Sequence, residues 1–281
     1  MSLLRHIKAV HAWDPSGFLP LLLTGHRVGR VRKDFALRLL DFPAVFARST
    51  DGIEIVPADV GPDGLTAAVG LVVRKLVQAG EIPSWRNEWF DVGADDDRRP
   101  LFRIDRGALP RFGVRAYGVH LNGYVRRPDG LHLWIARRAP DKLVDPDKLD
   151  NVVAGGMGAG HDPWSTLLKE AEEEASLSKE IAGKAIPVGI VSYAMERENG
   201  LRDDVLFLYD LELPADVVPT PNDQEIVGFE LLPVGEVLRL VRDTDDVKFN
   251  VALTLIDFFV RHGVIGPGDP DYLPICRGLR G

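Results

Sequence analysis

A glycine-rich turn that leads directly into a strongly acidic helix constrains this chain more than any other feature. The stretch 152–177 reads VVAGGMGAGHDPWSTLLKEAEEEASL, which is two apolar strand residues, a loop rich in glycine and a helix-forming segment. The aspartate–proline pair at 162–163 is a good helix start, with an N-cap followed by proline in the first helical position. Glu170, Glu173 and Glu174 then stand at i, i+3 and i+4, so we expect them to share one helix face. The pattern predicts three carboxylates beside a bare backbone loop.

This arrangement has two interpretations. Like charges at this spacing repel one another, and only Lys169 is near in sequence to offset them. One interpretation, without a binding function, is an acidic helix face exposed to solvent. The alternative is a site for Mg²⁺ or Mn²⁺, because hard carboxylate oxygens suit these cations and a glycine loop lets the backbone approach a metal or a phosphate. The loop next to the carboxylates favours the metal site.

The composition is that of an acidic protein from a reducing compartment. The 281 residues include 34 Lys and Arg against 42 Asp and Glu, which gives a formal net charge of −8 and a pI near 5.4. A nucleic-acid polymer requires a basic surface, so we do not expect one as a partner. The single cysteine, Cys276, cannot form an internal disulfide, and we find no signal peptide or membrane span. The sequence therefore predicts a cytoplasmic protein.

The chain changes character near residue 111. The first part mixes short patterns, with a predicted hairpin at 45–56, an amphipathic helix ending at Gly80, and an acidic stretch at 95–97 that indicates a solvated loop. Paired strand patterns and two amphipathic helices follow. The fold class is therefore α+β, and the predicted parts are an N-terminal α+β domain at 1–110, a second domain with a mixed sheet and helices at 111–265, and a C-terminal tail at 266–281.

The stretch 152–177 resembles the Nudix box, the strand–loop–helix signature of the Nudix hydrolases. That box reads glycine, five residues, glutamate, seven residues, and then R-E-U-x-E-E-x-G-U, where U is bulky and apolar. Gly155 takes the place of the first glycine, and the three helix glutamates keep their places with all spacings intact. Three positions depart from the pattern: His161 stands for the first glutamate, Lys169 for the arginine and Ser176 for the second glycine.

The resemblance implies an α/β/α sandwich with a mixed sheet, and a hydrolase that uses Mg²⁺ or Mn²⁺ to cleave a diphosphate linkage in a small molecule. It implies Glu173 and Glu174 as metal ligands, Glu170 as a further ligand or the base, and the backbone carbonyl of Ala154 as an additional ligand. Glu225, in a loop that enters a predicted strand, is our candidate for the further acidic ligand or base that such folds often keep. An ordinary loop carboxylate is the alternative for Glu225.

The substrate implied by the resemblance depends on a particular branch of the family. The segments HLNGYV, LWIARRAPDKLVDPDKLDNVVAGGMGAG and LKEAEEEASL look like the Nudix part of fungal thiamine pyrophosphokinase fusions, which carry an N-terminal domain of unknown function. That branch implies thiamine diphosphate or its oxidised analogues. Nucleoside diphosphates or triphosphates are an alternative, because the box indicates diphosphate chemistry and not the attached group. There are two further alternatives. One is a Nudix-fold binding module without activity, suggested by His161 and Lys169, and the other is a merely structural acidic helix.

Cationic residues outside the box are candidates for substrate binding. Arg138 and Lys142 follow a predicted strand and are expected to bind a phosphate, with solvated loop charges as the alternative. Lys248 is a third candidate, and the nearby Asn250 is predicted to be the N-cap of the last helix.

Two further pairs have mainly structural interpretations. His120 and Asn122 alternate along a strand and share one face, where we favour a hydrogen-bonded structural role over a place in the pocket. Trp85 and Trp89 are core or domain-interface candidates, with a stacking surface for a ring as the alternative. The N-terminal domain either shapes the pocket or forms a homodimer interface, and the sequence does not decide between them.

Overall fold

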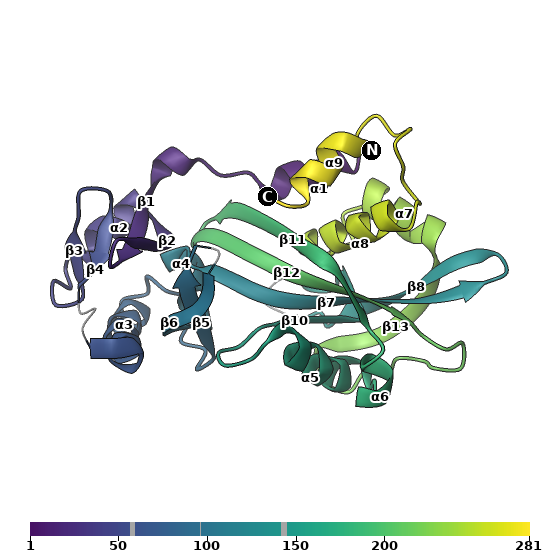
Figure 1. Ribbon diagram of the computed structural model, residues 1–281, viewed down its shortest axis with the longest axis horizontal. Helices are drawn as coiled ribbons and strands as arrows, with labels where there is room; N and C mark the ends of the chain where they lie inside the picture. Colours follow the sequence, from purple (N-terminus) through teal and green to yellow (C-terminus); the bar gives the residue numbers. More distant parts are fainter. Residues whose placement is uncertain (57–59, 96, 142–144) are drawn as a thin grey trace.

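The computed structural model describes residues 1–56, 60–95, 97–141 and 145–281. Figure 1 shows a smaller N-terminal unit lying beside a larger sandwich, in which helices cover both faces of one long sheet. The fold is the α+β class expected from the sequence, with a mixed sheet and a separate N-terminal unit.

The N-terminal unit is built around a small sheet with strand order β2-β1-β4-β3. Its strands and the helices beside them are β1 (Phe18–Leu23), β2 (His26–Arg32), α2 (Lys33–Leu39), β3 (Phe46–Arg48), β4 (Ile53–Ile55) and α3 (Gly61–Gln78). A separate hairpin, β5 (Trp89–Ala94) and β6 (Asp97–Asp105), packs on α3, and the chain leaves the unit through α4 (Leu109–Phe112). Their apolar side chains form one continuous core, in which Phe35 and Phe112 meet edge to face.

The second unit contains a seven-stranded mixed sheet. Its path is β11-β12-β7-β8-β13, with β10 paired to β7 and β9 paired to β8. The strands are β7 (Arg115–Arg127), β8 (Gly130–Arg138), β9 (Leu149–Asp150), β10 (Val153–Gly156), β11 (Ile186–Arg197), β12 (Gly200–Glu212) and β13 (Ile226–Pro233). Strands β12 and β7 run parallel and the other pairs are antiparallel. Because side chains alternate between the faces of a strand, each face needs its own cover.

Two sets of helices provide that cover and complete the three layers. One face packs against α5 (Pro163–Ala175) and α6 (Lys179–Ala182), and the other against α7 (Val234–Asp243) and α8 (Phe249–Arg261). This is the predicted α/β/α sandwich with a mixed sheet.

The first helix of the chain belongs to the core of the second unit. Helix α1 (Leu4–Val10) packs against α8 and the last helix α9 (Tyr272–Gly278), and Leu3, Ile7 and Val10 are buried there. Figure 1 shows α1 and α9 side by side above α8. The chain thus starts in the sandwich, builds the N-terminal unit and then returns. The domain limits expected from the sequence, 1–110, 111–265 and 266–281, stay predictions.

Most predicted elements are present, and two details are wrong. The hairpin at 45–56 forms, as β3 and β4, and β7 and β8 form one of the strand pairs expected after residue 111. Of the acidic stretch 95–97, Asp95 follows β5 and forms an ion pair with Arg27 at 2.6 Å, Asp97 begins β6, and residue 96 lies outside the described ranges. Asn250 is a buried residue inside α8, whose N-cap is Lys248, so the helix starts two residues earlier than an N-cap at Asn250 predicts. Within the described ranges, no helix is long and apolar enough to cross a membrane.

Candidate functional site

Helix α5 begins where its sequence predicts, with Asp162 as its N-cap. The side chain of Asp162 accepts hydrogen bonds from the backbone N–H groups of Trp164 and Ser165, and the Ser165 hydroxyl completes a reciprocal capping box. The helix ends at Ser176, which has the left-handed conformation that usually favours glycine (φ 54°). Its hydroxyl donates to the carbonyl of Thr220 at 3.0 Å. These contacts therefore fix both ends of helix α5, and its first end is also the end of the glycine loop.

Glu174 is the most deeply buried acid of the cluster. It is 6% exposed, and its Oε2 accepts a hydrogen bond from the backbone N–H of Ala154 at 2.8 Å. Burial raises the pKa of Glu174 to about 8, and the neighbouring carboxylates of Asp150 and Glu170 add to this, while the hydrogen bond from Ala154 opposes it. Strand β10 and helix α5 are thus joined through a carboxyl group that has a strong tendency to hold a proton or another cation.

Glu170 lies directly against the glycine that opens the loop. A Cβ atom on Gly155 would lie 2.5 Å from Cδ of Glu170 and 2.9 Å from its Oε2. The lack of a side chain on Gly155 is what lets this carboxyl approach the strand backbone. Burial raises the pKa of Glu170, and the charges of Glu173 and Glu225 add to the effect against the opposing charge of Lys169.

Glu173 and Glu225 are more exposed. Lys169 Nζ lies 2.7 Å from Glu173 Oε2 and 3.2 Å from Glu170 Oε1, so this lysine bridges two of the acids. Glu225 precedes β13, and its charge contributes to the pKa of Glu170, which places it on the same side of the site. The site residues predicted from the box, with Glu225, therefore lie in one region.

Arg138 and Lys248 meet on a carboxylate that the sequence did not single out. Arg138 Nη1 lies 2.9 Å, and Lys248 Nζ 3.0 Å, from the same atom, Oδ2 of Asp150. All three residues are buried, so neither cation is a solvated loop charge. Burial alone would raise the pKa of Asp150, but the charges of Lys248 and Arg138 outweigh it and hold the pKa below its usual value.

His120 and Asn122 belong to a buried hydrogen-bond network between the sheet and α8. His120 Nδ1 is 2.8 Å from Asn151 Oδ1, and Asn151 Nδ2 donates to Asn122 Oδ1 at 2.8 Å. Thr254 of α8 also donates to Asn151 Oδ1, at 2.7 Å. The structural role favoured for His120 and Asn122 is confirmed by these partners.

The remaining predicted residues divide into those the structure places and one it does not describe. Lys142 lies outside the described residues. Trp85 and Trp89 meet edge to face within the N-terminal unit, with ring centroids 5.3 Å apart, and Trp85 packs on the core of that unit. His161 is exposed at the end of the glycine loop. In the ranges that the structure describes, no three His, Cys, Asp or Glu side chains converge in a ready-made cation site.

Asp150 is the site residue that sequence reasoning missed. The partners of its carboxylate, Arg138 and Lys248, lie 12 and 98 positions away in the sequence. The pairing could be recognised only once β8, β9 and the start of α8 were brought together.

Comparisons with known proteins agree with this geometry. Residues 117–252 match the family model described as the NUDIX domain, and residues 2–116 match a domain of unknown function, DUF4743. Nudix hydrolase 24, chloroplastic, from Arabidopsis thaliana is 42% identical over 94% of this chain and 73% of its own length. Nudix hydrolase 20, chloroplastic, from the same plant is 39% identical over 94% of this chain and 73% of its own length. An uncharacterised protein of Saccharomyces cerevisiae is 35% identical over 70% of this chain and 61% of its own length.

These matches confirm the resemblance drawn from the box, including the N-terminal domain of unknown function. Both plant relatives are named as chloroplastic proteins, and the cytoplasmic location expected for this chain stays a prediction. Nudix hydrolases act on small-molecule substrates and generally use divalent metal ions. This chain belongs to the Nudix hydrolase family, because it has the acidic helix α5, the loop after Gly155 and relatives that match nearly its whole length.

Proposed function

We propose that the protein is a divalent-metal-dependent hydrolase that cleaves a diphosphate linkage in a small molecule. The observation that carries this proposal is the position of Glu170 and Glu174 against the backbone of Ala154 and Gly155. Two largely buried carboxyls with raised pKa values, held against a bare strand backbone, form a donor set of hard oxygens.

The residues present fit a divalent cation such as Mg²⁺ or Mn²⁺. Among the described residues, no cationic side chain bonds the carboxyl of Glu174, so its burial is costly unless it holds a proton or a metal ion. Glu170, Glu173, Glu174 and the carbonyl of Ala154 would hold the cation. When bound, it would lower the pKa of a water molecule and offset the charge of the diphosphate.

The protein's own groups have separate roles in this proposal. Glu170, with its raised pKa, accepts a proton at its carboxylate from the attacking water, and the exposed Glu225 beside it is the second candidate for that role. The water oxygen bonds to one phosphorus, the bond from that phosphorus to the bridging oxygen breaks, and the leaving phosphate takes up the electron pair. Arg138 and Lys248 bind the substrate phosphates by their positive charge, oriented by Asp150.

The substrate we propose first is thiamine diphosphate or an oxidised analogue of it. This choice depends on the resemblance to the Nudix part of thiamine pyrophosphokinase fusions. Nucleoside diphosphates and triphosphates are the alternative substrate class, and a binding module without turnover is the alternative function.

The test is the release of phosphate or of a phosphate-bearing fragment, with Mg²⁺, with Mn²⁺ and with EDTA. The substrates are thiamine diphosphate, its oxidised analogues, ADP-ribose, NADH and oxidised guanine nucleotides. Glu173→Gln is expected to lose turnover, whereas Glu172→Gln is the matched control, because Glu172 is an exposed acid on the same helix that points away from the cluster. Equal turnover in both variants would refute the site. Binding of a substrate without turnover by the unaltered protein would favour the binding module.

A further inference from the structure

The loop between β10 and α5 is held by the N-terminal unit. The backbone N–H of Ala159 donates to the carbonyl of Trp89 at 2.7 Å, and the N–H of Gly160 donates to Asp91 Oδ2, also at 2.7 Å. Trp89 and Asp91 belong to β5, a strand of the matched domain of unknown function. Two consecutive loop amides of the Nudix box are thus bonded to acceptors from outside the Nudix domain.

Strand β5 also approaches the start of the loop. A Cβ atom on Gly156 would lie 3.1 Å from Cζ of Phe90, so the phenyl ring sits close against the strand residue that follows Gly155. Gly155 is the residue that Glu170 contacts. Residues of β5 therefore support both ends of the segment between the acidic cluster and the N-cap of α5.

Asp91 is itself held in place. Its Oδ1 accepts a hydrogen bond from Nε of Arg103 at 3.1 Å, and the backbone N–H of Arg103 donates to Oγ1 of Thr66 in α3 at 2.9 Å. One carboxyl thus joins the helix and the hairpin of the N-terminal unit to the loop. A charged acceptor of this kind forms a stronger hydrogen bond than a neutral one.

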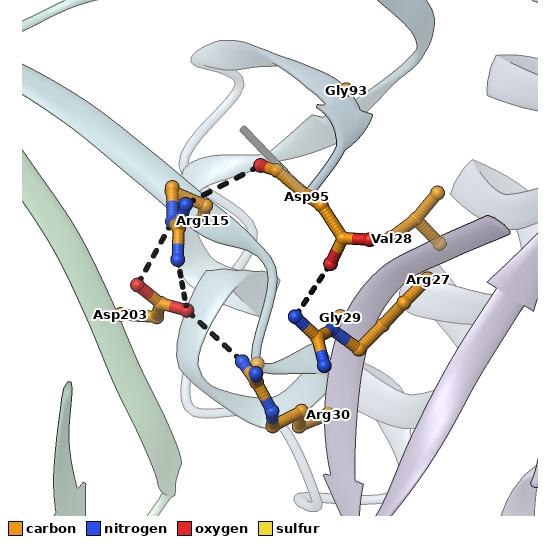
Figure 2. A pocket seen from close by; sticks show the side chains of 9 residues that line it. Arg27, Val28, Gly29, Arg30, Gly93, Asp95, Arg115 and Asp203 are labelled. Carbon is orange, nitrogen blue, oxygen red and sulfur yellow. Dashed lines mark hydrogen bonds and ion pairs between the residues drawn. The ribbon is translucent and has the colours of Figure 1, made fainter. Parts of the chain in front are cut away.

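The β5–β6 hairpin is anchored to the sandwich at a second point. Figure 2 shows a chain of contacts from Arg27 to Asp95, from the Asp95 carbonyl to Arg115, and from Arg115 through Asp203 to Arg30. Asp203 lies on β12 and Arg115 on β7, while Arg27 and Arg30 lie on β2 of the N-terminal unit. Turning the hairpin away from the loop would break the hydrogen bond from Arg115 to the Asp95 carbonyl, and moving the whole N-terminal unit would also break the ion pair between Arg30 and Asp203.

We propose that Asp91 is a positioning residue for the hydrolase site, and that the N-terminal domain serves to hold the loop 157–162 in its working conformation. The expected effect of Asp91 on turnover rests on the proposed function, whereas its expected effect on the conformation of the loop does not. Without Asp91, the N–H of Gly160 loses its acceptor and the loop gains freedom. The alignment of Ala154 and Gly155 with Glu170 and Glu174 then becomes less well defined, which is costly for a site that depends on geometry.

The test compares Asp91→Ala, Asp91→Asn and Asp97→Ala by hydrogen exchange of the peptide covering 157–162, with the peptide covering α8 as the internal reference for global unfolding. Asp97 is the matched control, because it lies on the same hairpin and, within the described ranges, its carboxylate accepts hydrogen bonds from Arg99 and none from the loop. We expect exchange of the loop to be at least about tenfold faster in Asp91→Ala. Asp91→Asn, which keeps an acceptor oxygen, should restore most of the protection, and Asp97→Ala should leave it unchanged.

Two readouts accompany the exchange measurement. Mn²⁺ affinity should fall in Asp91→Ala, and kcat should drop by roughly tenfold with little change in KM, because Asp91 acts on the loop and not on the substrate. Unchanged loop exchange in Asp91→Ala would overturn the proposal. Equal acceleration in the loop and in α8 would also overturn it, because the role of Asp91 would then be general stability. If the unaltered protein hydrolyses no compound, the proposed function fails, while loop exchange and Mn²⁺ affinity still decide the role of Asp91.

Discussion

Gly155 and Glu170 are in such close contact that only glycine fits at the first position. Because a Cβ atom there would lie 2.5 Å from Cδ of Glu170, a Gly155→Ala variant must push the carboxyl away from the strand. We expect turnover to fall by about a hundredfold, since the acid is displaced by roughly an ångström. Gly158→Ala is the control in the same loop, because a Cβ atom there would make only an ordinary contact, 3.7 Å from the Trp89 carbonyl oxygen. Similar activity in the two variants would contradict the placement of Glu170.

Glu174→Gln should separate stability from activity. Burial raises the pKa of Glu174 to about 8, so at pH 7 the carboxyl of the metal-free protein is mostly protonated, and glutamine is a close replacement that still accepts from the Ala154 N–H. We expect urea unfolding at pH 7 to change by no more than about 1 kcal/mol, while Mn²⁺ binding and turnover are lost. A stability loss well above that value would indicate that Glu174 is ionised and paired in the metal-free fold.

Asp150→Ala should destabilise the protein strongly. The change leaves Arg138 and Lys248 buried without the carboxylate on which both now converge. Removing one member of a buried charge cluster typically costs about 3 kcal/mol or more. The control is Glu88→Ala, which breaks an exposed pair with Arg106 at 2.8 Å and is expected to cost at most about 1 kcal/mol. Chemical denaturation measures both, and equal losses would contradict the importance of the buried cluster.

His120 should make stability depend on pH in the mildly acidic range. Burial lowers the pKa of His120 to about 4, from an ordinary value of 6.5, so the unfolded chain binds a proton between these values that the folded chain does not. The free energy of unfolding should therefore fall as the pH is lowered from 6.5 to 4, by up to about 3 kcal/mol from this group.

The His120→Gln variant should flatten that part of the stability curve. His26→Gln, which removes an exposed histidine, should leave its slope as it is. Stability curves measured by denaturation at several pH values distinguish the two, and an unchanged slope in His120→Gln would show that another group causes the acid sensitivity.

Local signals allowed much of the fold to be predicted. The Asp51–Gly52 turn, the aspartate–proline helix start and the alternation of His120 and Asn122 each depend on residues close together in the chain, and each element forms where expected. The i, i+3 and i+4 spacing likewise placed the three acids on one side of α5. These predictions succeeded because short-range geometry determines them.

The parts that were missed depend on long-range packing. Asp150 looks unremarkable until two cations from distant segments reach it, and Asn250 suggested a cap although helix α8 begins at Phe249. The acidic stretch at the β5–β6 hairpin resembles a solvated loop in sequence, yet Asp95 bonds Arg27 of β2 and Asp97 bonds Arg99 of the hairpin. Local patterns could not reveal these partners.

The position of α1 has a consequence for any attempt to study the catalytic unit alone. A fragment starting at residue 111 would lack Leu3, Ile7 and Val10, and would leave the side of α8 and α9 that they cover open to water. Such a fragment is expected to expose an apolar surface and to aggregate, whatever the N-terminal domain contributes to catalysis. In topological terms the N-terminal unit is an insertion between the first helix and the sheet of the sandwich. Helices α1 and α9 pack against each other, so a circular permutation that links α9 to α1 and opens the chain between the two units would place each unit in one continuous segment.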